Sequence, residues 1–337
     1  MVKNFNPREA ARGLLQSLAP SRPLFLPIVF SLGARIENVS LRNYLTNPTK
    51  ISNALRQIRA HLRSDGVTCY FDPYLEAEAL GAVLDWQSDA RQPSLRWPQP
   101  SHDGELPEGL CAPEEIAKRG RIPIAVEVIR RLKPLVRDDF LLMAGVTGPL
   151  TLAALLAQIG VSASPRREPP PDSALNLAAE AVPVAARALV EAGANVLFIR
   201  EEFLPASPAA LADWSARLAT AINIVRFFEA LPVVLLGSPQ HAPGDFESTL
   251  REPLDAVICA PMSAHAPTGG LHQRAAAHGI ALPASAFESD QSDAAQLAAS
   301  LRQAISDLHP ALVTTSTDLA PTADLKYLNA IAEEVNC

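Results

Sequence analysis

Acidic side chains follow two apolar segments of this chain, and they are its clearest candidates for chemistry. Asp72 comes directly after residues 67–71, and Glu201 and Glu202 come shortly after residues 195–199. Carboxylates that share a partly dry site repel one another, which raises at least one pKa and permits acid or base catalysis. We therefore predict that Asp72, Glu201 and Glu202 are catalytic groups.

Each of these carboxylates also has a purely structural interpretation. An aspartate before a proline, such as Asp72 before Pro73, opens a turn by accepting a hydrogen bond from nearby backbone. Glu201 or Glu202 could instead cap the helix that follows in the chain. The residues themselves leave both interpretations open.

Further polar residues stand at the ends of other apolar segments. We predict His241 as a fourth catalytic group, with an exposed loop histidine as the alternative. Arg35 is predicted to hold an anionic group of the substrate through paired hydrogen bonds. The other predicted substrate contacts are Ser31, Thr147, Ser238, Cys259 and Ser316.

A metal site has weaker support in the sequence. His241, Cys259, His265 and His272 lie near one another in the chain. Zinc favours such ligands, but the spacing of these four matches none of the compact ligand patterns of zinc proteins. We therefore predict no metal ligands.

Eight short apolar segments, separated by helical patterns, must position these side chains. They are residues 23–30, 67–71, 140–145, 195–199, 232–236, 255–259, 279–283 and 311–315. The segments lack polar alternation, as buried parallel strands do, so the chain is predicted to be an α/β protein, a TIM (β/α)8 barrel. The carboxyl ends of the strands then form the active-site mouth. A doubly wound open sheet is the alternative, but no glycine-rich nucleotide motif is present.

One domain over residues 1–337 is predicted. Residues 1–22 form an N-terminal helical extension outside the main body. Nine of the 30 prolines lie in two segments, 88–115 and 162–173, which are predicted to be long loops.

Composition excludes several classes of partner. The chain has 29 basic and 36 acidic residues without a basic run, so neither nucleic acid nor an anionic membrane is an expected partner. The N-terminus lacks the apolar core of a signal peptide, and no apolar run reaches the roughly 18 residues of a membrane span. Four cysteines lie far apart, which favours reduced thiols. We expect a cytoplasmic protein with a small-molecule substrate.

Six short motifs, in their order and spacing, resemble the uroporphyrinogen decarboxylase superfamily. They are residues 44–48 (YLTNP), 65–67 (DGV), 71–81 (FDPYLEAEALG), 145–153 (GVTGPLTLA), 193–196 (GANV) and 317–321 (TDLAP). The resemblance runs from about Pro23 to Ala332. It implies a TIM barrel, in agreement with the eight apolar segments. The superfamily holds the haem-pathway decarboxylases and the corrinoid-linked methyltransferases.

The segment Thr147 to Ala153 is similar to the methyltransferase branch. This resemblance implies transfer of a methyl group between a small organic substrate and a cobalamin, held by a partner corrinoid protein or bound directly. Many members of that branch carry zinc through a His-x-Cys pair and a late cysteine. Here the pair falls on Leu236 and Ser238 and the late cysteine falls within residues 314–317, so the zinc site of that branch is not expected.

Two alternative functions remain open. In the haem decarboxylases the resemblance places a catalytic aspartate at Asp72, but their tyrosine falls on Leu155 and their late histidine falls near Thr315 or Ser316. Arg35 alone stands where those enzymes have an arginine-rich segment. A decarboxylase of a tetrapyrrole or a smaller carboxylate is thus the first alternative. A non-catalytic binding subunit of a methyltransferase complex is the second.

Overall fold

Eight parallel strands form the main sheet, and each coincides with one of the apolar segments. They are β1 (Leu24–Phe25), β2 (Gly66–Tyr70), β5 (Leu141–Thr147), β6 (Val196–Glu201), β7 (Leu231–Leu236), β8 (Val257–Pro261), β9 (Ala277–Leu282) and β10 (Leu312–Thr315). Their order in the sheet is β1-β10-β9-β8-β7-β6-β5-β2. The computed structural model describes residues 5–88, 92–98, 106–136, 140–158, 169–205, 207–237, 254–262, 277–287 and 291–336.

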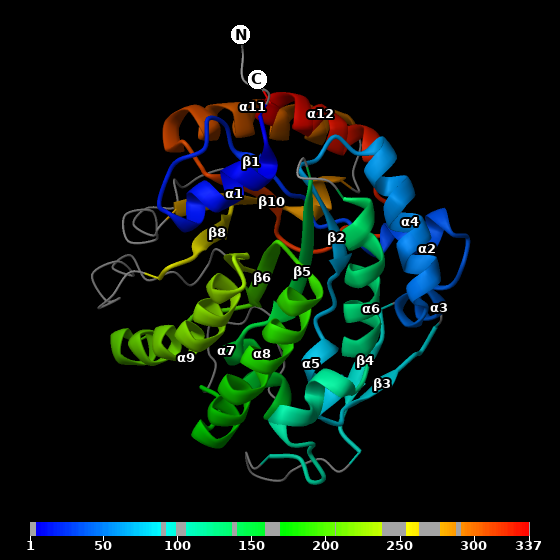
Figure 1. Ribbon diagram of the computed structural model, residues 1–337, viewed down its shortest axis with the longest axis vertical. Helices are drawn as coiled ribbons and strands as arrows, with labels where there is room; N and C mark the ends of the chain where they lie inside the picture. The colour runs from blue at the N-terminus through cyan, green and yellow to red at the C-terminus, as the bar shows by residue number, and fades with distance from the viewer. Residues whose placement is uncertain are drawn as a thin grey trace.

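Helices surround this sheet on its outside, so the protein is a TIM barrel (Figure 1). They are α1 (Pro7–Leu15), α2 (Leu32–Ile36), α3 (Leu41–Thr46), α4 (Pro48–His61), α5 (Leu75–Leu80), α6 (Ile122–Leu132), α7 (Pro149–Leu156), α8 (Asp172–Ala192), α9 (Pro208–Phe227), α11 (Gln291–Leu308) and α12 (Leu325–Asn336). Short 3-10 turns lie at η1 (Pro113–Lys118), η2 (Lys133–Leu135) and η4 (Ala284–Phe287).

Local sequence sets the ends of these helices. The Asn47 side chain accepts hydrogen bonds from the backbone of Thr49 and Lys50, and Pro48 occupies the first helical position of α4. Helix α8 ends at Gly193, whose φ of 124° is strained for a residue with a side chain. The motifs at these positions therefore specify helix boundaries.

Asp65 closes the seam between β1 and β2, which share no ladder in the described residues. Its backbone N–H donates to Phe25 O at 2.9 Å, and its carboxylate accepts from Phe25 N at 2.8 Å. The guanidinium of Arg22 adds two contacts of 2.8 Å to the same carboxylate. One side chain thus joins the first strand of the barrel to the second.

The N-terminal helix differs from the expectation that it lies outside the main body. Ala11 and Leu14 of α1 are buried in the core, and Arg8 Nε donates to the backbone oxygen of Phe140, just before β5. These contacts place α1 across the amino ends of the strands. It packs there because its apolar face covers the bottom of the barrel.

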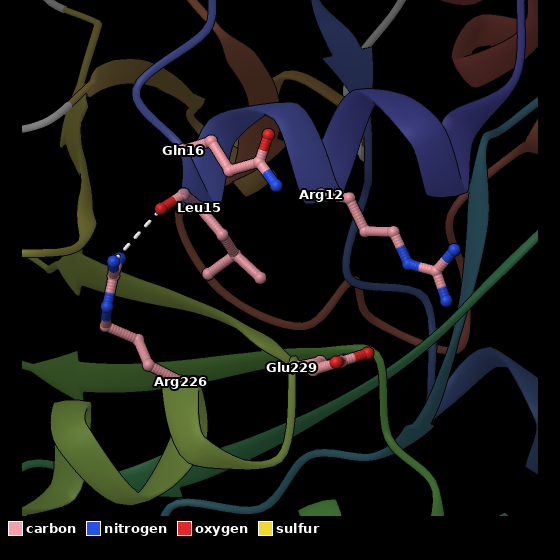
Figure 2. Close-up of a pocket in the computed structure, with 5 residues that line it drawn as sticks. All are labelled: Arg12, Leu15, Gln16, Arg226 and Glu229. Atoms are coloured by element: carbon pink, nitrogen blue, oxygen red, sulfur yellow. Dashed lines mark hydrogen bonds between the residues drawn. The ribbon is translucent and has the colours of Figure 1, made fainter.

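A pocket of about 520 Å³ lies beside α1, at the end of the barrel opposite the carboxyl ends of the strands. It is lined by Arg12, Leu15, Gln16, Arg226 and Glu229. Figure 2 shows Arg226 reaching back to the Leu15 oxygen, at 3.0 Å, and the same guanidinium also contacts Asp255 O. Arg226 therefore joins α9 to α1 and is occupied by protein.

The first proline-rich segment, predicted to be a loop, contains ordered structure. Strands β3 (Val83–Asp85) and β4 (Ser94–Arg96) pair antiparallel, and η1 follows. Trp97, next to β4, is buried and donates from its indole to Leu155 O at 3.0 Å. That bond anchors the segment on α7. Of the second segment, 162–173, residues 162–168 lie outside the described part and α8 begins at Asp172.

Helix α8 is mostly apolar, and its four charged side chains, Asp172, Glu180, Arg187 and Glu191, are all exposed. In the described chain it alone is long and apolar enough to cross a membrane, and half of that stretch is buried inside the protein. It packs against α6, α7 and α9. Its apolar side chains are therefore also explained by its packing in the outer layer of the barrel.

Candidate active site at the barrel mouth

Asp72 lies directly after β2, at the mouth, as expected, and it is enclosed by protein. Its two carboxylate oxygens accept from Arg121 at 2.7 and 3.1 Å, and the side chains are 1% and 3% exposed. Asp72 Oδ1 also accepts from the backbone N–H of Tyr74 at 2.8 Å, which is the turn predicted for an aspartate before proline. Both structural contacts are therefore present, and a catalytic role for Asp72 stays a prediction.

Arg121, at the start of α6, is itself surrounded by acceptors. Its Nε donates to Glu78 at 2.6 Å, and one terminal nitrogen lies 3.5 Å from the Tyr70 hydroxyl. Burial alone would lower the pKa of this guanidinium, but the Asp72 and Glu78 carboxylates outweigh burial and raise it. This cluster of charges holds β2 and α6 together, since each charged group has partners.

Glu201, at the end of β6, is fully buried and has four donors. Its oxygens accept from the backbone of Leu150 and Thr151, from the Thr151 hydroxyl at 2.6 Å and from the Trp214 indole at 2.9 Å. Desolvation raises its pKa to about 7, although these four hydrogen bonds oppose the shift. Glu201 thus caps the N-terminus of α7, which precedes it in the chain, whereas the sequence suggested a cap on the helix that follows.

The direction of Glu201 fixes the direction of its neighbour. Its partners belong to the outer helices α7 and α9, so its side chain points out of the barrel. Successive side chains of a strand point to opposite faces, so Arg200 points inward. Residue Gly148 supports this outward packing, because a Cβ there would lie 2.3 Å from the Glu201 carboxyl carbon.

Arg200, Glu202, Phe71 and Thr147 form what we call the inner rim of the mouth. Arg200 is paired in register with Thr147 of β5, and its guanidinium lies 5.9 Å from the centre of the Phe71 ring. Glu202 forms an ion pair with Arg200 at 2.7 Å, and its backbone N–H donates to Thr151 Oγ1. The Phe71 ring covers Gly145, where a Cβ would lie only 2.4 Å from it. The inner rim therefore joins the ends of β2, β5 and β6.

Glu76 in α5 is a buried carboxyl group next to the inner rim. Its Oε2 accepts from the Thr147 backbone at 3.2 Å, while its Oε1 is buried without a partner. Burial raises its pKa to about 7, and the nearby Asp72 carboxylate adds to the shift. Thr147 is occupied on both sides, because its hydroxyl donates to Pro73 O at 3.0 Å.

Tyr74 adds a half-buried phenol to this side of the mouth. Its pKa is raised by burial first, then by the negative charges of Asp72 and Glu202, while Arg200 lowers it. The backbone N–H of Tyr74 donates to Asp72 Oδ1 at 2.8 Å, so this residue lies at the turn that follows β2.

Ser31 and Ser316 lie on the other side of the mouth, near β1 and β10. Ser31 is buried, and Asp318 accepts from the backbone of Phe30 at 2.7 Å and of Ser31 at 2.9 Å. Ser316 is half-buried, and its backbone donates to Leu282 O. Burial raises the pKa of Asp318 to about 7. This side thus contributes a further carboxyl group, which follows β10 at the mouth.

Two predicted substrate contacts lie away from the inner rim. Arg35 is exposed on α2, and its guanidinium donates to Ala323 O at 2.7 Å. That contact ties α2 to the segment before α12, which leaves no observed role for Arg35 at the inner rim. Cys259 is fully buried in β8, where burial raises the pKa of its thiol. His241 and Ser238 lie outside the described residues.

The described residues do not fit the zinc site of the methyltransferase branch. No group of three His, Cys, Asp or Glu side chains within them could hold a metal ion. Leu236, in the place of a ligand, is a buried apolar side chain. At the late position Thr314 and Thr315 donate their hydroxyls to the backbone of Leu26 and Thr317.

Sequence reasoning missed Arg200, Tyr74, Glu76 and Arg121. Arg200 stands beside two residues that were predicted, but β6 is buried on both faces and carries no alternation to show which side chain points inward. Arg121 meets Asp72 from 49 positions away. The motif FDPYLEAEALG contained Tyr74 and Glu76, and its two glutamates were the signal that could have found the second buried carboxyl group.

Comparison with known proteins supports the fold and the family. The model of the uroporphyrinogen decarboxylase family matches residues 26–217. Two relatives from Methanosarcina barkeri, both named methylcobamide:CoM methyltransferase MtaA, are 32% identical over 127 residues. That stretch covers 37% of this chain and 36% of each relative, so the similarity spans about a third of the relatives' length.

A solved structure extends the similarity to the whole fold. A methyltransferase from Methanosarcina mazei superposes with a TM-score of 0.76 at 19% identity, over 99% of both chains. At that identity the likeness concerns the fold. Because the family model matches more than half of the chain and the fold agrees throughout, this protein belongs to the uroporphyrinogen decarboxylase family.

Proposed function

We propose that this protein transfers a methyl group between a corrinoid and a small organic substrate. The observation that carries the proposal is the 127-residue similarity to the two methylcobamide:CoM methyltransferases. A corrinoid supplies an activated methyl group, which a nucleophile such as a thiolate accepts. We infer that a separate corrinoid protein presents it at the barrel mouth.

The residues of the inner rim supply positioning and proton transfer. Glu202 is 24% exposed and has one charged partner, whereas Asp72 and Glu201 are enclosed by theirs. We therefore propose that Glu202 accepts the proton that the nucleophile loses. Phe71 provides an apolar floor that excludes water from this side. His241 stays a predicted catalytic group.

Decarboxylation of a tetrapyrrole has less support from the geometry. Such a substrate carries several carboxylates and needs several cations to hold them. Arg35 is occupied outside the inner rim and Arg121 is enclosed by acceptors. Within the described part of the mouth, Arg200 is the cation left for a substrate.

The test is an anaerobic assay with methylcobalamin and a set of small thiols, followed by the cobalt absorption spectrum. Turnover is expected with at least one thiol and should fall at least tenfold in Glu202→Gln. A matched control is Glu127→Gln, which removes a carboxylate from the exposed Arg131 pair on α6. The proposal is overturned if the protein shows no turnover and also does not bind methylcobalamin. Conversion of uroporphyrinogen would favour the decarboxylase instead.

A second outcome would favour a binding subunit. In that case the protein would bind methylcobalamin without turnover with any thiol, and would form a stable complex with a catalytic relative. Co-purification from a host that expresses both chains would detect such a complex. This outcome would also count against the role given to Glu202.

A further inference from the structure

Arg200 is a half-buried cation with few partners, and its Nε atom is buried. A guanidinium has five N–H donors. In the described structure Arg200 has one charged partner, Glu202, and its Nε is buried without any hydrogen-bond acceptor. A buried donor without an acceptor destabilises the folded protein. The unsatisfied Nε at the barrel mouth therefore lowers the stability of the protein.

Arg121 provides the contrast on the same side of the barrel. Its guanidinium meets Asp72 through two nitrogens and Glu78 through Nε, so its donors face acceptors of the protein itself. Arg121 is a structural cation by this criterion. Arg200 differs, because the edge of its guanidinium that includes Nε has no acceptor.

The surroundings of Arg200 fit an anion. The side chain points into the barrel and is 16% exposed, with the Phe71 ring at 5.9 Å. Charges in a site of low polarity interact more strongly than in water. Thr147, the facing residue in the neighbouring strand, uses its own polar groups on Pro73 and Glu76. A ligand at this place would therefore meet the guanidinium directly.

In the structure, Glu202 occupies part of the space beside the Arg200 guanidinium. Its carboxylate lies 2.7 Å from a terminal nitrogen of Arg200 and is 24% exposed. Gly237, just after β7, leaves it room, because a Cβ at this position would lie 2.5 Å from Glu202 Oε2. The carboxylate that faces Arg200 is thus at the edge of solvent, and a ligand could displace it.

We propose that Arg200 binds the anionic group of the substrate and that Glu202 holds the same position until the substrate arrives. The ligand class is a small organic acid with a carboxylate or sulfonate at one end. Displacement of Glu202 from Arg200 frees it to accept a proton from the nucleophile at the other end. This binding site lies in the same mouth as the proposed methyl transfer, and the proposal rests on that function for the reaction that the bound acid undergoes.

The test compares two probes of nearly equal shape, the anion 3-mercaptopropionate and its neutral amide, 3-mercaptopropionamide. Their binding is measured by calorimetry with the full chain and no methyl donor. We expect the acid to bind at least about tenfold more tightly, since hydrogen bonds between charged groups are stronger than those of a neutral amide. Arg200→Gln should abolish this preference. Glu202→Gln should strengthen binding of the acid several-fold, because the internal competitor is gone.

Opposite signs for these two variants distinguish substrate binding from a structural ion pair. If the pair only supports the fold, both variants weaken binding by the same factor, and the proposal fails. It also fails if Arg200→Gln keeps the preference for the acid. Arg131→Gln is the matched control, since it breaks an exposed pair on α6 and should change nothing.

Two further measurements keep the test decisive. If Arg200→Gln does not fold, Arg200→Lys keeps the charge but loses the planar edge, and should retain only part of the preference. An Arg200→Lys variant that keeps the full preference for the acid would contradict the proposal. Binding is measured without methylcobalamin, so the two proposals can fail separately. If the protein prefers the acid but transfers no methyl group, the proposed reaction is refuted and the binding role of Arg200 stands.

Discussion

Arg200 and Glu201 are neighbours in one strand, yet their side chains lie in opposite environments. Glu201 faces the outer helices and accepts four hydrogen bonds there. Arg200 faces the inside of the barrel with one charged partner and an unsatisfied Nε. A single step along β6 therefore separates a group that holds the scaffold together from one that is open to a ligand.

The difference shows which polar residues of a barrel mouth to suspect of function. Buried polar groups in proteins are normally satisfied, so saturation by protein partners indicates a structural role. Glu201 and the Asp72–Arg121 pair meet that description. Arg200, Glu202 and Glu76 do not, because each has an unpaired atom or a single partner. The following predictions test this division.

The largest effect is expected from Glu201→Leu. The change leaves the backbone N–H groups of Leu150 and Thr151 and the Trp214 indole without an acceptor. We expect a loss of about 4 kcal/mol or more in the free energy of unfolding, since each buried orphan costs about 1–3 kcal/mol. Urea unfolding measures it. Glu191→Leu, at an exposed position of α8, is the control, and a loss as small as the control's would contradict the structural role of Glu201.

Asp72→Asn should be the next most disruptive change. It leaves the buried Arg121 cation short of a charge partner, and breaking a buried pair costs about 3–5 kcal/mol. The double variant Asp72→Asn, Arg121→Met should recover part of that loss in urea unfolding. If Asp72 is catalytic as well, methyl transfer stays lost in the double variant. If the single variant is as stable as the unchanged protein, Asp72 is not a structural group and belongs with Arg200 and Glu202.

The pH dependence of stability tests Glu76. Burial raises its pKa from 4.5 to about 7, so between these values the folded protein holds a proton that the unfolded chain has released. Stability from this group is therefore present at low pH and lost as pH rises toward 7, by at most about 1.4 kcal/mol per pH unit.

Glu76→Gln should flatten this dependence, which unfolding midpoints at pH 5 and pH 7 would show. Glu201 and Asp318 have raised pKa values as well and should keep part of the slope. The control is Glu180→Gln, on the partly exposed side of α8. An unchanged slope in Glu76→Gln would mean that its carboxyl group is not protonated in the folded protein.

The smallest effect on stability is expected from Gly237→Ala. Its Cβ would lie 2.5 Å from Glu202 Oε2 and 3.1 Å from Glu202 Cα, so the carboxylate must move and the backbone must shift slightly, at a cost of about 1 kcal/mol. Movement of Glu202 away from Arg200 should make 3-mercaptopropionate bind more tightly by calorimetry. Weaker binding would show that Glu202 assists the anion and does not compete with it.

The sequence predicted the barrel and its family well because the motifs are largely structural. Asn47 caps α4, Asp65 closes the seam of the sheet, Gly145 lies under Phe71, and Gly148 lies under Glu201. Apolar strands and helix caps are local features, so they can be found one segment at a time. The eight strands follow from such features.

The site was less predictable, since it depends on contacts between distant segments. Nothing near Asp72 in the chain shows that Arg121 encloses it, and no local pattern shows which way Arg200 points. Arg35 was expected in the mouth because it follows β1, but α2 carries it outward to Ala323. The pairing of β3 with β4 was missed because both strands are short and β4 lies between Pro93 and Pro98.

Thermal unfolding with and without saturating 3-mercaptopropionate tests the division between scaffold and substrate groups most directly. A ligand raises the midpoint only of a protein that binds it. We predict the same rise for the unchanged protein and for Glu201→Gln, which unfolds earlier but keeps its inner rim, and no rise for Arg200→Gln. A rise that persists in Arg200→Gln and disappears in Glu201→Gln would contradict it.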